Sequence, residues 1–499
     1  MRTAGSNFAR SLQWLGLTLL LVTPLVSRAQ TPQATPPPPA EPRSVTVPKP
    51  VEQTLANGLR VIVVERTNMP LVSAQLMIKN GGEVDPQELS GLADMTANLL
   101  SKGTQTRNAT QIAEAIEFLG GILEIGARWD ASAAAVGVMS SKIGEAMSIL
   151  ADVVRRPTFE ADEIERLRQQ YLDALTVSLG QPGTIARFVA GRVVFGDLPY
   201  GHPLGGTPES LARIKREDIV KLHSKFYRPD NAILVIGGDI RPKDAFALAK
   251  RNFGDWQKPK TPLPAVSSTS KVPEPSKTGR ILVIDKPDAG QAAVYLTRTG
   301  INRRDPDYFR GIVTNSVLSG YSGRLNQEIR IKRGLSYGAG STLDTRRDVG
   351  PFVASAQTKN ESGAEVARLL IGEIERLSSA PPLEAELTPR KAVVIGNFSR
   401  NLETVSGLVN QVSSLALFGL PLDEINRYIQ NVQTITTADV QKFAGTRLDS
   451  KGANIIIVGN AKEFLPDLKK QFPDIEVIPI SELDLNSAAL RKQQKQPTE

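Results

Sequence analysis

The chain has 499 residues, of which 40% are hydrophobic and 22% are charged, and its formal net charge is +8. This length favours two or more domains, because one hydrophobic core rarely grows beyond about 300 residues. The absence of cysteine excludes disulfides, thiolate zinc sites, iron–sulfur clusters and cysteine nucleophiles. Only two histidines are present, His202 and His223, so most familiar hydrolase mechanisms are hard to build.

Residues 1–29 are expected to be a secretory signal peptide. Two arginines precede the apolar run Leu15–Val26, and Ser27 and Ala29 have the spacing of small residues before a cleavage site. The run is shorter than the roughly 20 apolar residues that span a bilayer, so an uncleaved anchor is the less favoured alternative. We therefore expect a periplasmic or secreted protein with no transmembrane segment after cleavage.

Two proline-rich stretches divide the rest of the chain, because proline neither continues a helix nor donates to a strand ladder. The expected parts are a linker at 30–50, an N-terminal domain at 51–260, a second linker at 261–278, a C-terminal domain at 279–485 and a polar, frayed tail at 486–499. Lys and Arg are interspersed with Asp and Glu along these parts, so no nucleic-acid partner is expected.

Hydrophobic periodicity predicts a mixture of helices and strands in the first block. Strands are expected at 60–65, 72–78, 128–138 and 232–238, and helices at 91–100, 113–119, 144–155, 161–179 and 217–226. This mixture of elements indicates an α+β fold rather than an all-helical or all-strand domain.

The second block looks like a copy of the first. Ala232–Gly238 (AILVIGG) corresponds to Ala453–Gly459 (ANIIIVG), 221 residues later. Ser141–Ala146 likewise matches the neighbourhood of Glu361–Val366, at an offset of 220. Two separate matches with nearly one offset indicate an internal duplication, so two homologous α/β-layered domains of about 210 residues each are expected.

The segment Gly91–Thr104 reads GLADMTANLLSKGT. It is similar to the inverted zinc-binding helix of the M16 metallopeptidases, the insulinase and mitochondrial-processing-peptidase family, whose frame reads Gly-Leu-Ala-His-x-x-Glu-His. Here Asp94, Ala97 and Asn98 stand where the family has histidine, glutamate and histidine. The family's third ligand is a glutamate further along the chain, and its position falls on Ala174.

Further motifs in the family's order extend the resemblance over residues 50–470. They are Phe195–Gly205 (FGDLPYGHPLG), Phe226–Asn231 (FYRPDN), Ser322–Arg330 (SGRLNQEIR) and Ile331–Tyr337 (IKRGLSY). The resemblance implies one half of an M16 clamshell, and it places the family's substrate-contacting arginine and tyrosine on Arg330 and Tyr337. The arginine is expected to close a helix and the tyrosine to lie in the next strand after the Gly334 turn, with both side-chain heads at one surface.

The helix at 91–100 offers few side chains that could bind a metal ion. A catalytic zinc needs about three imidazole or carboxylate ligands, and one carboxylate beside an amide and a methyl group is a poor substitute. A hard-cation site at Asp94 is the less favoured alternative, because one carboxylate binds such ions weakly. His202 and His223 lack the spacing of a helical metal pair and are expected to be structural. We therefore expect no metal in this chain and no catalytic residue of its own.

The resemblance supports two functional hypotheses of different kinds. In the first, the chain is the zinc-free subunit of a heterodimeric M16 peptidase, in which a zinc-bearing partner cleaves peptides and this chain supplies Arg330 and Tyr337 and completes the chamber. In the second, it is a non-proteolytic scaffold or peptide-binding homologue. A third possibility, an active metallopeptidase, would need an unprecedented ligand set, and the sequence leaves open whether the chain contributes to catalysis.

Overall fold

The computed structural model describes residues 46–265 and 279–492. The predicted signal peptide at 1–29 lies outside these ranges, as do most of the first linker, much of the second linker and the end of the tail. Within the two described ranges, no helix has both the length and the apolar character that crossing a membrane requires.

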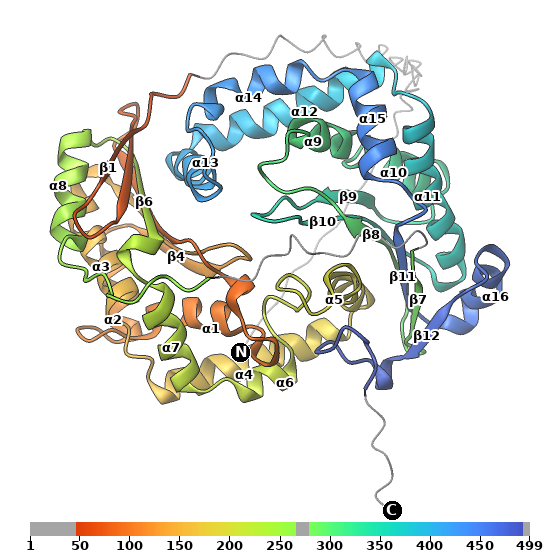
Figure 1. The fold of residues 1–499 in the computed structure, drawn as a ribbon, viewed down its shortest axis with the longest axis horizontal. Coiled ribbons are helices and arrows are strands. Elements are labelled where there is room, and N and C mark those ends of the chain that lie inside the picture. The colour runs from red at the N-terminus through yellow and green to blue at the C-terminus, as the bar shows by residue number, and fades with distance from the viewer. Residues whose placement is uncertain (1–45, 266–278, 493–499) are drawn as a thin grey trace, which may run out of the picture. The chain divides into compact units, whose positions relative to one another are not determined.

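Two six-stranded sheets organise the described chain (Figure 1), and they belong to one compact unit. The first has the order β1-β2-β6-β3-β5-β4 and the second the order β12-β7-β11-β8-β10-β9. The first sheet consists of β1 (Val51–Thr54), β2 (Arg60–Glu65), β3 (Leu71–Ile78), β4 (Ile122–Ala127), β5 (Ser132–Met139) and β6 (Ala232–Gly238). The second consists of β7 (Ile281–Asp285), β8 (Ala292–Thr299), β9 (Ala339–Leu343), β10 (Pro351–Thr358), β11 (Asn454–Gly459) and β12 (Glu476–Pro479).

Sixteen helices of the described chain surround these sheets, which confirms the α+β fold class. Those of the first half are α1 (Leu92–Leu99), α2 (Ala109–Phe118), α3 (Ile143–Arg155), α4 (Ala161–Leu179), α5 (Pro182–Phe195), α6 (Pro208–Arg213), α7 (Arg216–Phe226) and α8 (Pro242–Phe253). Those of the second half are α9 (Tyr308–Leu318), α10 (Arg324–Asn326), α11 (Gly363–Ser379), α12 (Glu384–Glu403), α13 (Val405–Leu417), α14 (Glu424–Gln433), α15 (Thr437–Arg447) and α16 (Ala461–Gln471).

The second sheet repeats the first in strand order and spacing, in agreement with the predicted duplication. Strands β3 and β8 begin at residues 71 and 292, an offset of 221, and helices α7 and α15 begin at 216 and 437, with the same offset. The parallel pairing of β2 with β6 recurs between β7 and β11. The outermost strands differ, because β1 pairs with β2 antiparallel whereas β12 pairs with β7 in parallel.

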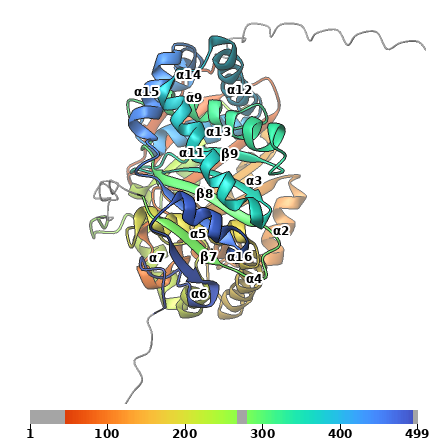
Figure 2. The ribbon, with the colours of Figure 1, turned by 90° about the vertical axis from the view of Figure 1, so that its right-hand side faces the viewer.

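Each sheet has one face covered by its own half of the chain and another face covered in part by a helix from the other half. Helix α5 packs on β8 and β11, with Ile185 and Val189 buried against the second sheet, and it lies beside β8 in both Figure 1 and Figure 2. In return, α13 packs Leu408 and Val412 on β3 and β6 of the first sheet. A buried Leu, Ile or Val side chain contributes about 1.5 to 3 kcal/mol, so this exchange joins the two halves strongly.

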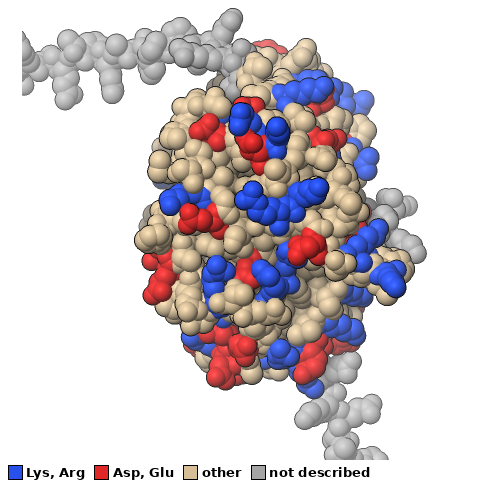
Figure 3. All heavy atoms as spheres, turned by 90° about the vertical axis from the view of Figure 1, so that its left-hand side faces the viewer, with Lys and Arg blue, Asp and Glu red and all other residues tan. Residues whose placement is uncertain are grey.

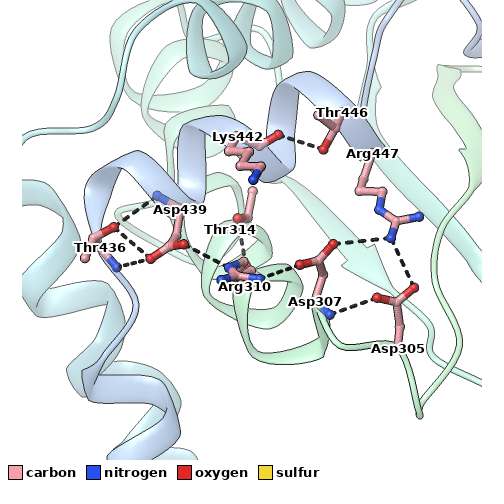
Figure 4. A network of polar contacts seen from close by, with 9 residues as sticks. All are labelled: Asp305, Asp307, Arg310, Thr314, Thr436, Asp439, Lys442, Thr446 and Arg447. Carbon is pink, nitrogen blue, oxygen red and sulfur yellow. Dashed lines mark hydrogen bonds and ion pairs between the residues drawn. The ribbon is translucent and has the colours of Figure 1, made fainter.

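An ion-pair network fastens α15 to α9 in the second half (Figure 4). Arg310 donates to Asp439 at 2.9 Å and to Asp307 at 2.6 Å. Arg447, the last residue of α15, donates to Asp307 at 3.2 Å and lies 3.5 Å from Asp305. Thr436 caps α15, because its hydroxyl accepts from the main-chain N–H of Asp439 at 3.1 Å. The Asp439 carboxylate in turn accepts from the main-chain N–H of Thr436 at 3.0 Å, so it takes part in both the cap and the ion-pair network.

Charge is not gathered in one patch on the face shown in Figure 3, where basic and acidic side chains are interspersed. A nucleic-acid site would require a basic stripe or cluster. The expected absence of a nucleic-acid partner remains a prediction.

Several details of the fold differ from the expectation, and the strand expected at 128–138 begins at Ser132 as β5. Helix α2 begins at Ala109 rather than residue 113, because Asn108 and Gln111 form a capping box. Strands β1 and β4 and helices α5, α6 and α8 were not expected. The tail does not fray up to Lys492, because Leu490 is fully buried in the cluster under α5.

Arg347 joins the two halves through a set of polar contacts. It lies between β9 and β10, and its guanidinium donates to Glu83 Oε1 at 3.0 Å, to the main-chain oxygen of Lys79 at 2.6 Å and to that of Asp130 at 2.7 Å. Its main-chain N–H donates to Asp130 Oδ2 at 2.8 Å. One side chain therefore satisfies acceptors on two loops of the first half.

The preceding residue, Arg346, stacks on aromatic rings of the first half. Its guanidinium carbon lies 4.5 Å from the ring centre of Trp129 and 4.6 Å from that of Tyr200. Asp344 accepts from the same guanidinium at 2.7 Å. The Arg346 cation is therefore paired with a carboxylate while it stacks on the two rings. The two arginines together form an inter-half clasp, defined here as Arg346, Arg347 and the first-half groups that they contact.

The clasp depends on a buried carboxylate. Glu83 accepts from the Asn80 side chain at 2.9 Å and from the main-chain N–H of Gly81 at 2.6 Å, in addition to Arg347. Burial raises the pKa of Glu83 to about 7, against the opposing effect of the Arg347 charge.

Replacing Arg347 should weaken the fold. Arg347→Ala is expected to lower the free energy of unfolding by about 2 to 3 kcal/mol, because it leaves Glu83 buried without its cation and frees two main-chain acceptors. Urea unfolding of the full chain measures this change. Arg304→Ala, which alters an exposed arginine, serves as the control, and equal stability of the two variants would contradict a structural role for the clasp.

The raised pKa of Glu83 gives stability a predictable pH dependence. The folded state holds the proton more tightly than the unfolded state, so this group stabilises the fold fully below about pH 4.5, and the contribution is lost as pH rises through about 7. The loss amounts to about 3 kcal/mol. Subtracting the unfolding free energy of Glu83→Gln from that of the wild type at each pH should reveal a decline between pH 5 and 8, whereas a constant difference would show that Glu83 does not titrate there.

Candidate functional site

Helix α1 carries the predicted remnant of a metal site, and its first turn is fixed by a glycine and a carboxylate. Gly91 has φ of +94°, and a Cβ there would lie 2.9 Å from the Cα of Gly206. Asp85 accepts from the main-chain N–H groups of Gly91 at 2.9 Å and Ala93 at 2.8 Å, which satisfies free donors of the first turn. Burial raises the pKa of Asp85. Sequence analysis missed this residue.

Asp94, Ala97 and Asn98 lie on one side of α1, as the helical spacing predicts. The Asn98 amide donates to the main-chain oxygen of Asp94 at 2.9 Å and lies 3.3 Å from its carboxylate. Ala97 is completely buried, so its methyl group is not exposed to solvent.

The α4 residue that reaches this position is Tyr171 rather than Ala174. The Tyr171 hydroxyl donates to Asp94 Oδ2 at 2.9 Å, whereas Ala174 is exposed. Burial raises the pKa of both Asp94 and Tyr171, and the neighbouring carboxylate raises that of Tyr171 further. Tyr171 lies about one helical turn before Ala174 on α4, so the two residues lie near one side of the helix. Helical periodicity alone could therefore have indicated Tyr171 as a residue near Asp94.

These side chains do not fit a zinc ion. The Asp94 carboxylate is already occupied by the Tyr171 hydroxyl and the Asn98 amide, and neither an amide nor a methyl group replaces an imidazole. In the part of the chain that the structure describes, no group of three or more His, Asp or Glu side chains could hold a metal ion. The metal-free state of the chain remains a prediction.

Both histidines are held by packing and main-chain contacts. The ring nitrogens of His202 lie 3.1 Å from the oxygen of Pro203 and 3.0 Å from that of Gly82. His223 Nε2 lies 2.9 Å from the oxygen of Val154, and its ring stacks on Tyr227 at 4.6 Å. Burial lowers the pKa of each histidine to about 4, so both are neutral near pH 7.

Arg330 lies on a π-helical turn, Gln327–Lys332, that directly follows α10. Such turns are uncommon and occur frequently at functional sites. The Arg330 side chain is half-buried, and its guanidinium carbon lies 5.6 Å from the ring centre of Tyr321. The expected position of Arg330 at the end of a helical segment agrees with this geometry.

Tyr337 differs from its expected placement. It lies in the irregular segment before β9, which begins at Ala339, and not in a strand. Gly334, with φ of +65°, makes the predicted turn, and the N–H of Gly334 donates to the oxygen of Arg330 at 3.0 Å. Tyr337 is 89% exposed, so its hydroxyl is available to a ligand. Nothing in the described contacts joins the Arg330 and Tyr337 side chains, so their action on one ligand remains a prediction.

Comparison with known families finds two matches that together span much of the chain. Residues 60–179 match the family described as insulinase (peptidase family M16), and residues 213–393 match the peptidase M16 inactive domain. The first match includes α1 and α4, and the second includes the Arg330 turn and Tyr337.

Individual relatives agree with these family matches. An uncharacterized zinc protease of Mycobacterium leprae is 26% identical over 420 residues, covering 83% of this chain and 93% of the relative. The crystal structure of a peptidase M16 inactive domain from Pseudomonas fluorescens superposes with a TM-score of 0.76 at 26% identity, covering 82% of this chain and 98% of that one. The first half of the periplasmic protease PqqL from Escherichia coli shares the fold, with a TM-score of 0.65 at 18% identity, covering 86% of this chain and 98% of that one.

Metal analysis tests the poor fit of the α1 side chains. The purified full chain is equilibrated with zinc and then dialysed, and it is expected to retain far less than one zinc atom per chain. Inductively coupled plasma mass spectrometry measures the zinc content. Asp94→Asn provides the matched variant, because it removes the carboxylate while keeping the size of the side chain. Stoichiometric zinc in the wild type that is lost in this variant would contradict the prediction.

Proposed function

The chain belongs to the M16 peptidase family, and we propose that it is the zinc-free subunit of a two-chain peptidase. The observation that carries this proposal is an asymmetry between two sites. Asp94, Ala97 and Asn98 replace the family's metal ligands, and Tyr171 already occupies the one remaining carboxylate. By contrast, Arg330 and Tyr337 keep the residue types of the family's substrate-contacting pair.

In this proposal the partner chain provides the zinc and the cleavage chemistry. This chain completes the chamber, and Arg330 and Tyr337 bind the peptide. A guanidinium offers several fixed N–H donors and a phenol offers one O–H donor, so both can donate to a peptide carbonyl or to an oxygen that gains negative charge during cleavage. Neither side chain has to change its protonation state for this role.

A location outside the cytoplasm is also part of the proposal. It rests on the charged and apolar pattern of residues 1–29, which lie outside the described ranges. A zinc-bearing partner would have to be exported to the same compartment.

The likeness to the Pseudomonas fluorescens inactive domain supports a second candidate, a scaffold or peptide-binding protein with no part in proteolysis. The two candidates differ in one respect that can be measured. A subunit of a peptidase changes the activity of its partner, whereas a scaffold does not.

Reconstitution with a zinc-bearing M16 chain from the same host tests the proposal. The isolated chain is expected to cleave no unfolded peptide, and its addition should raise the partner's turnover. Arg330→Ala and Tyr337→Phe should each lower the turnover of the mixture by about tenfold or more, because each removes a donor to the peptide or to the developing charge. A fluorogenic unstructured peptide provides the assay.

Arg304→Ala, at an exposed arginine of the same half, is the control and should leave turnover unchanged. Unchanged turnover in both Arg330→Ala and Tyr337→Phe would reject the shared site. Failure of the chain to stimulate any zinc-bearing partner would favour the scaffold, and peptide cleavage by the isolated chain would reject both candidates.

A further inference from the structure

Arg330 differs from its neighbouring arginines because it lacks an acidic partner among the described residues. Four arginines near it in sequence are paired with carboxylates. These pairs are Arg324 with Glu386 at 2.7 Å, Arg333 with Glu328 at 3.0 Å, Arg346 with Asp344 at 2.7 Å and Arg347 with Glu83 at 3.0 Å. No ion pair or side-chain hydrogen bond within residues 46–265 and 279–492 involves Arg330. Its five N–H donors are therefore free to bind a ligand.

Tyr321 supports this unpaired guanidinium. Its ring centre lies 5.6 Å from the guanidinium carbon of Arg330, within the range of a cation–π contact, and the residue is 72% exposed. A ring on one side of a guanidinium restricts its orientation and displaces water from that side. The remaining N–H groups can then meet a planar acceptor from solution.

The loop that carries Tyr321 adopts a backbone conformation that requires two glycines. Gly320 has φ of +91°, which a side chain would strain. Gly323 has no room for a side chain, because a Cβ there would lie 2.3 Å from the oxygen of Ser319. The exposed position of Tyr321 is therefore a property of the loop and not of a freely rotating segment.

Asn326 connects this loop to the segment of Tyr337. It is buried, its amide nitrogen donates to the main-chain oxygen of Tyr321 at 2.6 Å, and its amide oxygen accepts from the main-chain N–H of Ala339 at 3.4 Å. Ala339 follows Tyr337 by two residues, and Asn326 directly precedes the π-helical turn of Arg330. The buried Asn326 amide thus links the chain segments that carry Tyr321, Arg330 and Tyr337.

We propose that Arg330 and Tyr321 form a binding site for a carboxylate on an extended peptide, and that Asn326 is the positioning residue of this site. The proposal rests on the proposed function and adds to it a substrate class, namely peptides that present an acidic side chain or a free C-terminal carboxylate. A carboxylate matches the fork of N–H groups on a guanidinium and can accept two of them at once. A polyanion such as a nucleic acid is disfavoured, because the arginines that flank Arg330 are already paired with carboxylates.

Fluorescence anisotropy with the isolated full chain tests the site without any partner. Three labelled, unstructured peptides of one length serve as probes. The first has a central Glu and an amidated C-terminus, the second has Gln in its place and is also amidated, and the third has Gln with a free C-terminus. The first peptide, the third or both should bind at least about fivefold more tightly than the second, because each presents a carboxylate.

Variants of the two contact residues give the decisive comparison. Tyr321→Ala should abolish most of the preference for the carboxylate, whereas Tyr321→Phe should keep it, because phenylalanine retains the ring face. Arg330→Lys should weaken the preference, since an ammonium cannot bind a carboxylate with two parallel N–H groups. Phe118→Ala is the matched control, because Phe118 is an 84% exposed aromatic residue on α2, and it should leave binding unchanged.

The role of Asn326 is separated from stability by its conservative variant. Asn326→Ala removes both hydrogen bonds and should lower the carboxylate preference, whereas Asn326→Gln keeps an amide donor and an amide acceptor and should retain more of it, and the thermal unfolding midpoint of each variant is measured alongside. Because Asn326 is buried and either variant can fail to fold, the exposed Tyr321→Ala variant keeps the test decisive.

Two outcomes would overturn the inference. Equal affinity for all three peptides would show that no carboxylate is recognised, and an unchanged preference in Tyr321→Ala would remove Tyr321 from the site. A clear preference in the isolated chain, combined with no stimulation of a zinc-bearing partner, would support the binding site and reject the peptidase role. The two proposals can therefore fail separately.

Discussion

The exchange of one helix between the two sheets is the constraint on which the rest of this structure depends. Helix α5 leaves the first half to cover the second sheet, and α13 does the reverse. Separating the halves would expose apolar strand residues such as Ile62, Val235 and Ile284 on both sheets at once. The two duplicated blocks therefore share an apolar interface, to which the inter-half clasp of Arg346 and Arg347 adds polar contacts.

Helix α1 packs in the first half although the side chains of Asp94, Ala97 and Asn98 do not fit a zinc ion. Gly91 and Asp85 still fix the first turn, and the apolar side of the helix still packs in the first core. At the positions that would face a metal, Asp94 is hydrogen-bonded to Tyr171 and Asn98. Polar groups at a buried position need hydrogen-bond partners, and Tyr171 and Asn98 provide them for the Asp94 carboxylate.

The region around Arg330 differs from α1, because its key side chain has no hydrogen-bond partner among the described residues. Most polar groups near it are paired, as with Arg324 and Glu386, but Arg330 has no acidic partner in the described part of the chain and contacts the ring of Tyr321. Tyr337 and Tyr321 are among the most exposed large side chains of the described chain. Among residues 46–265 and 279–492, this surface leaves one guanidinium and two phenol hydroxyls without a hydrogen-bond partner, which suits it to binding a ligand from solution.

Sequence alone determined the α+β class, the duplication and the bounds of regular elements such as α4 and β2, because these depend on local periodicity and on repeats. It also identified Asp94, Ala97 and Asn98 as altered positions on one helical side. The tertiary structure decided which α4 residue meets Asp94, where α5 and α13 pack, and that Tyr337 precedes its strand. It also showed that Tyr321 stacks on Arg330 and that Asn326 links their segments. These features arise from contacts between residues distant in the chain or from a turn that disrupts periodicity, and no local pattern encodes them.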